Sequence, residues 1–355
     1  MKHFKNFAML LAALAFISFG FTSCNGNDDK NENSADMTEL NTLITSCESL
    51  LSSATTTDYP QSAITTFSTT LSAVKAAVAK GGLSQSTVNN LVTQLTAAKD
   101  TFEAAAYGAI PASALTFGLS FDEGTGTSLK TTGSNTWTAT LQKGPSDIFG
   151  TDTGIPTFVT GKVGKALHFD KGAHLEIADY ASGKLLGNAL SIAVWVKPDE
   201  LYANNYIISY NYWNTWKFQV QDGGKPFFTG KTDNDACVDF DNETDNSVPA
   251  NAWTQLVVSV DLKAKTVSFY VNGSLTKLWD SSTKAGSFSN TFASYGTTLP
   301  ICIGACTTID EAKTWSWFST EVGQWGYFKG TLDELKVYNI ALTDGQVSKL
   351  YNDEK

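Results

Sequence analysis

Aromatic side chains toward the C-terminal end of the chain have types and spacing that suit a binding chemistry. Tryptophan and tyrosine rings stack on the C–H face of a sugar, while nearby amides and hydroxyls bind its hydroxyl groups. In the segment 305–330, ACTTIDEAKTWSWFSTEVGQWGYFKG, Trp315 and Trp317 share one strand face, as do Trp325 and Tyr327. This spacing predicts an aromatic hairpin. Its rings would either form a platform for a sugar or pack over a sheet face or the helical part of the chain.

Further aromatic residues belong to the same predicted surface. Tyr212 and Trp213 lie between the runs YIISY and WKFQV, in a turn where a tryptophan is easily presented to solvent. Trp195 alternates out of phase with Ile192 and Val194, so it points to the other face of its sheet. The predicted ligand-binding set is Tyr212, Trp213, Trp315, Trp317, Trp325, Tyr327 and Trp195.

Acidic residues give no pattern for glycoside hydrolysis, which needs two carboxylates facing each other across a sugar. The pairs Asp199-Glu200 and Asp333-Glu334 are adjacent and therefore point to opposite faces of a strand. Alternating acids do occur over residues 239–245, but this polar stretch is typical of a solvated loop, with calcium binding next and catalysis last. We assign no catalytic residue, and acids from separate strands remain an alternative.

The first 24 residues, MKHFKNFAMLLAALAFISFGFTSC, have a basic start and an apolar run, which is typical of a secretory signal. The small residues before Cys24 resemble the lipobox of bacterial lipoproteins. The polar residues after it resemble the stretch that directs Bacteroides-type lipoproteins to the outer cell surface. The resemblance implies a signal peptide over residues 1–23, a lipidated Cys24, a polar tether over 24–36, and an outer-membrane lipoprotein exposed on the cell surface.

Residues 37–108 carry three stripes of apolar residues at helical three-and-four spacing, which predicts an antiparallel three-helix bundle. The run TLSAVKAAVAKGGLSQSTVNNLVTQLTAAKDTF resembles FIVAR-type helical spacers of bacterial surface proteins. This resemblance implies a spacer between the anchor and a working domain. Cys47 lies on an apolar helical face and is predicted to be a buried thiol, whereas spacing does not settle the pairing of Cys237, Cys302 and Cys306.

From Leu115 onward, short runs of alternating apolar residues separated by turns predict an all-β sandwich or jelly roll. Two such runs, TQLVVSVDL and TVSFYV, precede an Asn272-Gly273 turn that is typical of a hairpin. Several ordered motifs then resemble the laminin-G-like, concanavalin A-like jelly-roll domain over residues 112–355. They are FDEGTGTSLKTTGSN, GKVGKALHFDKGAHLEI, LSIAVWVKPDE, WTQLVVSVDLKAKTVSFYVNG and GTLDELKVYNIALTDGQVSKLY.

This family includes lectins, glycan-binding modules, glycoside hydrolases and adhesive domains, so the resemblance implies a fold without fixing one function. It also implies one structural calcium ion, because domains of this kind often bind one at the end of the first strand and on the last strand. The matching positions are Asp122 in FDEG and Asp333 in TLDE.

The net charge of the chain limits the classes of ligand that it is expected to bind. The 25 basic residues are all lysines against 35 acids, giving a net charge of −10, and removal of Lys2 and Lys5 with the signal would make it −12. Without a guanidinium fork, binding of nucleic acid or another polyanion is disfavoured. We therefore predict a surface lipoprotein that binds a neutral poly- or oligosaccharide. The alternatives are a glycoside hydrolase of the same fold and an adhesin that binds a protein partner.

Overall fold

The computed structural model describes residues 35–56, 58–106, 108–233, 236–293, 298–316, 318 and 326–355. The predicted signal peptide, Cys24 and most of the polar tether lie outside these residues. Within the described ranges, every helix is too short or too polar to cross a bilayer.

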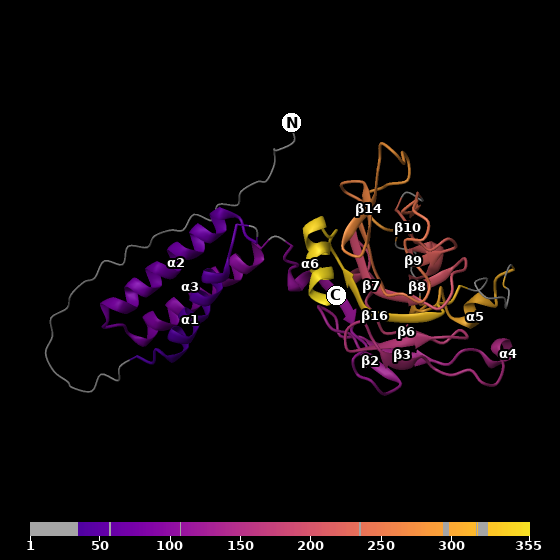
Figure 1. Cartoon of the computed structure of the whole chain (residues 1–355), viewed down its shortest axis with the longest axis horizontal. Coiled ribbons are helices and arrows are strands. Elements are labelled where there is room, and N and C mark those ends of the chain that lie inside the picture. The colour runs from indigo at the N-terminus through magenta and orange to yellow at the C-terminus, as the bar shows by residue number, and fades with distance from the viewer. Residues whose placement is uncertain are drawn as a thin grey trace.

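The N-terminal helices α1 (Thr38–Ser53), α2 (Gln61–Lys80) and α3 (Gln85–Ala104) pack into a bundle that lies beside the β part of the chain (Figure 1). Their shared core contains Leu40, Leu71 and Leu95. The Phe102 ring on α3 stacks on Phe67 with ring centres 4.5 Å apart. The helical spacing of the sequence therefore predicts this bundle correctly, because the apolar stripes form its interior.

The described strands form two antiparallel sheets packed face to face (Figure 1). In order, sheet A contains β14 (Ser274–Asp280), β13 (Thr266–Val271), β12 (Thr254–Asp261), β7 (Ala189–Pro198), β16 (Gly330–Tyr338), β5 (Lys165–Phe169) and β4 (Thr157–Thr160), with β1 (Leu115–Leu119) paired to β16. Sheet B contains β11 (Cys237–Asp241), β10 (Lys225–Lys231), β9 (Trp216–Gln221), β8 (Asn205–Tyr210), β15 (Ile301–Ile303), β6 (His174–Ile177), β3 (Thr138–Gln142) and β2 (Ser128–Lys130). The predicted jelly-roll sandwich is confirmed.

Short helices connect these strands. They are α4 (Ser146–Phe149), α5 (Ile309–Ala312) and the 3₁₀ turns η1 (Ala112–Ala114), η2 (Ser182–Lys184) and η3 (Tyr212–Asn214).

Side chains alternate along each strand, and those that point inward form the core between the two sheets. On β12, Leu256, Val258 and Val260 point inward and are fully buried. Val257 points outward but is also buried, because it joins a second apolar cluster on the outer face of sheet A. On β9, Trp216 lies in the main core, as its alternation with Phe218 predicts.

Helix α6 (Asp344–Glu354) covers the outer face of sheet A. A capping box of Thr343 and Gln346 begins this helix. The predicted hairpin turn lies beside it, since Gly273 has a φ of +76° and a Cβ there would overlap the Tyr351 ring. Gln346 Nε2 also donates to the Ala109 carbonyl at 2.7 Å, so α6 holds the linker that comes from the helical bundle.

Candidate functional site

Strand register places a row of polar and thiol side chains across the outer face of sheet B. Residues at neighbouring positions along a strand, such as Trp216 and Phe218 on β9, point into the core instead. From β11 to β6, the register aligns Asp239, Thr229, Lys217, Ser209, Cys302 and Glu176. This row lies on the opposite side of the sandwich from α6, and its central members Thr229, Lys217, Ser209 and Cys302 are buried.

Lys217 on β9 is a buried cation at the centre of this face, with only 1% of its surface exposed. Its ammonium donates to Gln219 Oε1 at 2.6 Å. The Nζ atom also lies 4.5 Å from the ring centre of Trp213, 4.8 Å from Phe227 and 5.0 Å from Tyr206. Burial lowers the pKa of Lys217 to about 8, while the π faces stabilise its charged form.

An aromatic cluster, here named the outer-face cluster, packs beside Lys217. The Tyr212 ring stacks on Trp315 with centres 4.9 Å apart and on Tyr206 with centres 6.1 Å apart. The cluster's buried members are Tyr206, Cys306, Ala312 and Tyr327, and its partly buried members are Phe149, Tyr212, Ile309, Trp315 and Phe318. The structure thus brings together Tyr212, Trp315 and Tyr327, which the sequence placed in one binding set.

The predicted aromatic hairpin is wrong in its first arm, which forms the helix α5 and turns. The Thr308 hydroxyl caps this helix by accepting a hydrogen bond from the Glu311 backbone N–H at 3.2 Å. Acidic residues in the first turn favour the helix further. Trp315 follows in a turn, where its backbone N–H donates to the Ala312 carbonyl at 3.0 Å. Two other predicted ring positions, Trp317 and Trp325, lie outside the described residues.

Trp213 presents an exposed ring on this face, with 39% of its surface accessible. It belongs to η3, a tight turn between β8 and β9 in which Asn211 and Tyr212 have φ values of 54° and 51°. The Thr215 hydroxyl donates to the Tyr210 carbonyl across this turn. The turn holds the indole over the Lys217 ammonium and leaves its remaining surface open to solvent.

Two members of the predicted set are buried, and these placements are corrections. Trp195 does point to an outer face, but α6 covers it and leaves 2% exposed. Its ring stacks on Tyr351 with centres 5.6 Å apart, and its Nε1 donates to Glu354 Oε2 at 2.8 Å. Tyr327 is also 2% exposed because it packs inside the outer-face cluster. Neither ring is accessible to a ligand in this arrangement.

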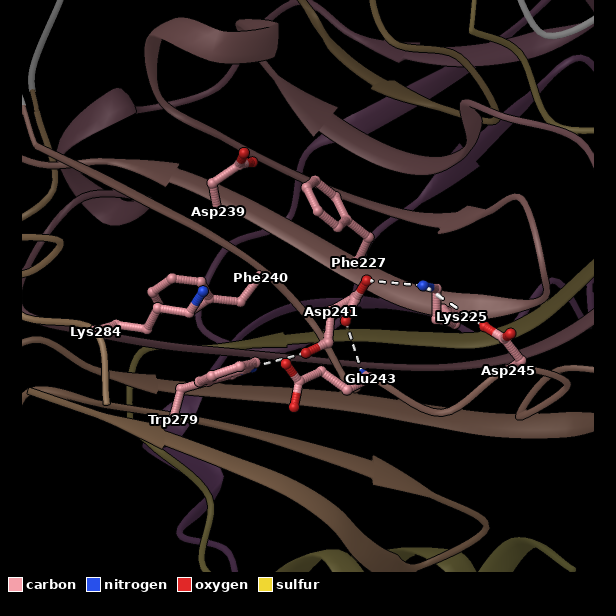
Figure 2. A pocket seen from close by; sticks show the side chains of 9 residues that line it. All are labelled: Lys225, Phe227, Asp239, Phe240, Asp241, Glu243, Asp245, Trp279 and Lys284. Atoms are coloured by element: carbon pink, nitrogen blue, oxygen red, sulfur yellow. Dashed lines mark hydrogen bonds and ion pairs between the residues drawn. The ribbon is translucent and has the colours of Figure 1, made fainter. Parts of the chain in front are cut away.

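A surface pocket of about 580 Å³ lies next to the outer-face cluster, where β10, β11 and β14 meet (Figure 2). Phe227 connects the pocket to Lys217, since its ring lines the pocket and lies 4.8 Å from the Lys217 ammonium. The lining residues are Lys225, Phe227, Asp239, Phe240, Asp241, Glu243, Asp245, Trp279 and Lys284.

Lys225 forms ion pairs with two of the acidic side chains of this pocket (Figure 2). Lys225 Nζ lies 3.3 Å from Asp241 Oδ2 and 3.6 Å from Asp245 Oδ1. The Trp279 Nε1 donates to the Asp241 carbonyl at 2.7 Å. The prediction of a loop over residues 239–245 is wrong in its first part, because Asp239 and Asp241 belong to β11 and continue the alternation of that strand.

Asp122 and Asp333, the predicted calcium ligands, bind the loop between β4 and β5. Asp333 Oδ2 accepts hydrogen bonds from the backbone N–H groups of Lys162 and Val163 at 2.8 and 2.9 Å. Asp122 Oδ1 accepts one from Lys165 at 2.8 Å. Burial raises the pKa of Asp333 to about 7, against the lowering effect of these donors.

Calcium needs six to eight oxygen ligands, whereas N–H groups point at these carboxylates. In the part of the chain that the structure describes, no group of three or more His, Cys, Asp and Glu side chains is placed to hold a metal ion. The described residues, as they are placed, therefore do not fit the implied ion. Cys47 and Cys302 are buried free thiols, and Cys237 is a partly exposed one.

Sequence reasoning missed Lys217, Tyr206 and Phe227, which support the exposed tryptophan. The run WKFQV contained a signal for the first of them, because Lys217 alternates with two core aromatic residues and must point to the opposite face. The contacts with Tyr206 and Phe227 come from neighbouring strands, so they depend on a register that one sequence does not display.

The described chain is therefore a two-sheet β-sandwich that carries an exposed indole, a buried cation and a polar pocket. Residues 169–348, half of the chain, match the family described as the concanavalin A-like lectin/glucanases superfamily, and the chain belongs to that superfamily. A comparison with curated proteins finds no match.

Similar solved structures include domain 4 of AbnA, a GH43 extracellular arabinanase from Geobacillus stearothermophilus, in complex with arabinotriose. It has a TM-score of 0.48 and 23% identity over 67% of this chain and 98% of that one. The binding domain of Paraclostridial Mosquitocidal Protein 1 has a TM-score of 0.47 and 16% identity, covering 68% of this chain and 52% of its own. The Botulinum Neurotoxin DC binding domain in complex with SialylT has a TM-score of 0.45 and 13% identity, covering 69% and 52%. The chain spans about half the length of the two toxin domains.

Proposed function

We propose that the protein binds a neutral poly- or oligosaccharide on the outer face of sheet B, with Trp213 as the ring on which a sugar stacks. The observation that supports this proposal is the 39% exposed indole, fixed over the Lys217 ammonium beside the stacked Tyr212–Trp315 pair. An exposed aromatic ring that is already held in place loses little conformational entropy when a sugar binds.

Neutral ligands suit the charge of this face. Acidic side chains outnumber lysines in the adjoining pocket, and the whole chain has a net charge of −10 with no arginine. A sulfated or carboxylated glycan would meet repulsion without a bidentate donor to offset it. Hydroxyl groups of a neutral sugar, in contrast, donate to carboxylates and accept from ammonium groups.

The test is affinity gel electrophoresis of the purified protein in gels that contain neutral or sulfated polysaccharides. We expect retardation by a neutral polysaccharide and about a tenfold loss of affinity in Trp213→Ala. Leu278→Ala is the matched control, since Leu278 is 48% exposed on β14 of the other sheet. Equal retardation of wild type and Trp213→Ala would contradict the proposed site.

Three further results with the same purified protein and polysaccharides would distinguish the alternative functions. Release of reducing ends from a polysaccharide would support a glycoside hydrolase. Capture of a protein partner that added oligosaccharide does not displace would support an adhesin. Preferential retardation in heparin gels would refute the neutral-ligand proposal.

We also propose that Cys24 is lipidated and anchors the protein to the outer membrane, with the helical bundle as a spacer. This proposal rests on the sequence of the first 36 residues. In cells, Cys24→Ala should leave the membrane fraction, and wild type should be cleaved when intact cells are treated with protease. Retention of Cys24→Ala in the membrane fraction would contradict the anchor.

A further inference from the structure

The half-buried Phe227 links the pocket at β10, β11 and β14 to the exposed Trp213, because its ring lines the pocket and contacts the same Lys217 ammonium as Trp213. Strand register places Gln219, Phe227 and Asp241 side by side, one row away from the row that contains Lys217. The Lys217 Nζ lies 4.5 Å from the Trp213 ring centre and 4.8 Å from the Phe227 ring centre, so the two rings are within about 9 Å of each other. An oligosaccharide chain is long enough to span that distance.

We infer that the pocket is a second sugar subsite continuous with Trp213, so that the ligand is an extended chain crossing β9, β10 and β11 rather than a single terminal sugar. This inference rests on the proposed function. Beyond that proposal, it specifies that the ligand has several sugar units, and it names the residues that bind the second unit.

The pocket has the chemistry for sugar hydroxyl groups. Lys225 lies between Asp241 and Asp245, at 3.3 and 3.6 Å, and so places donors and acceptors side by side (Figure 2). A hydroxyl group is both a donor and an acceptor, and it can bridge an ammonium and a carboxylate. The half-buried Phe227 ring supplies an apolar wall on the side toward Trp213.

Trp279 has a different role from Trp213. It is only 6% exposed, and the ammonium groups of Lys277 and Lys284 lie 4.0 and 4.6 Å from its ring centre. Cations thus lie against this ring, and its Nε1 is bonded to the Asp241 carbonyl. Trp279 fixes the wall of the pocket, and polar groups rather than a stacked ring bind the second unit.

The pocket volume is sufficient for this role. About 580 Å³ lies within the range of ligand pockets in proteins, roughly 300–1,000 Å³. Carboxylates from four residues and ammonium groups from two line it, so its charge excludes acidic units of a chain more strongly than the surface at Trp213 does. We therefore assign an uncharged chain to both subsites.

The test is isothermal titration of the purified protein with linear arabino-, xylo-, manno- and cello-oligosaccharides of two to six units. For a series that binds, the wild type should bind the hexasaccharide at least about tenfold more tightly than the disaccharide. In Lys225→Met and in Phe227→Ala this ratio should fall toward one. Lys130→Met, at the exposed far edge of sheet B, is the matched control and should keep the wild-type ratio.

The outcomes separate the two proposals. Equal affinity for short and long chains, lost in Trp213→Ala, would overturn the second subsite and leave the proposed function intact. A hexasaccharide affinity that neither pocket variant changes would also overturn it. If no series binds, the proposed function fails together with the subsite. Near-ultraviolet circular dichroism shows whether each variant is folded. If Phe227→Ala does not fold, the ratio measured for Lys225→Met decides the test.

Discussion

Lys217 should make the stability of the protein depend on pH in a way that one substitution removes. Its ammonium is 1% exposed, and burial lowers its pKa from 10.5 to about 8 in the folded protein. Between these values the unfolded chain holds a proton that the folded chain has released. The free energy of unfolding therefore rises with pH in this window. From pH 7.5 to 9.5 this single group contributes an increase of about 2 kcal/mol.

Lys217→Met tests this reasoning, because methionine keeps the apolar stem of the side chain and removes its charge. Urea unfolding of wild type and variant at both pH values gives four free energies. The stability difference between the two proteins should shift by about 2 kcal/mol in favour of wild type as the pH rises. The contributions of all other titrating groups to the pH dependence are nearly the same in the two proteins, so they largely cancel in this difference.

Lys130→Met is the control, since Lys130 is exposed and its removal should leave the pH dependence unchanged. Parallel pH dependence in wild type and Lys217→Met would refute the assignment of Lys217 as a desolvated cation. The same result would remove the physical reason for treating the Trp213 ring as held over a buried charge.

Three other predictions concern stability. Gly164→Ala should destabilise the protein by about 2 kcal/mol in thermal unfolding. Gly164 has a φ of +51°, and a Cβ there would clash with the Asp122 carboxylate. Gly183→Ala is the control and should have little effect, because no atom lies near its Cβ position. Glu354→Gln should cost about 1–2 kcal/mol in urea unfolding, because it removes the negative charge that pairs with the Lys336 ammonium at a site where both side chains are largely buried. The exposed Asp353→Asn should change stability by less than about 0.5 kcal/mol. Millimolar calcium in place of a chelator should leave the melting temperature unchanged, and a rise would show that the loop aspartates bind the ion after all.

Most of the fold could be predicted from the sequence because its signals are local. The alternation of Leu256, Val258 and Val260 fixes which face of β12 is inside, and the core confirms it. The Asn272-Gly273 pair predicts its hairpin turn because both residues readily adopt positive φ. These patterns depend on neighbours along the chain, and long-range pairing changes none of them.

The site was harder to predict because burial on an outer face depends on distant segments. Trp195 has the right phase for an outer face, but nothing near it in the sequence shows that Tyr351 of α6 will cover it. Trp315 has strand-like spacing with its neighbours, yet the Thr308 cap begins the helix α5 at Ile309, and Trp315 follows that helix in a turn. Trp213 was placed correctly because a turn beside two buried strands leaves a large ring little to pack against.

The two outer faces of the sandwich are covered by different segments, and this difference bears on where the proposed binding site lies. On sheet A, α6 buries Val257 and Tyr270 and also holds the linker from the helical bundle through Ala109. In Figure 1, α6 lies on the side toward α1–α3, whereas β8, β9 and α5 lie on the far side. The contacts with α6 and the linker therefore cover sheet A, whereas the exposed Trp213 ring lies on the side of sheet B. Under the proposed anchoring, the chain would enter from the side of sheet A, and Trp213 would be presented on the opposite side.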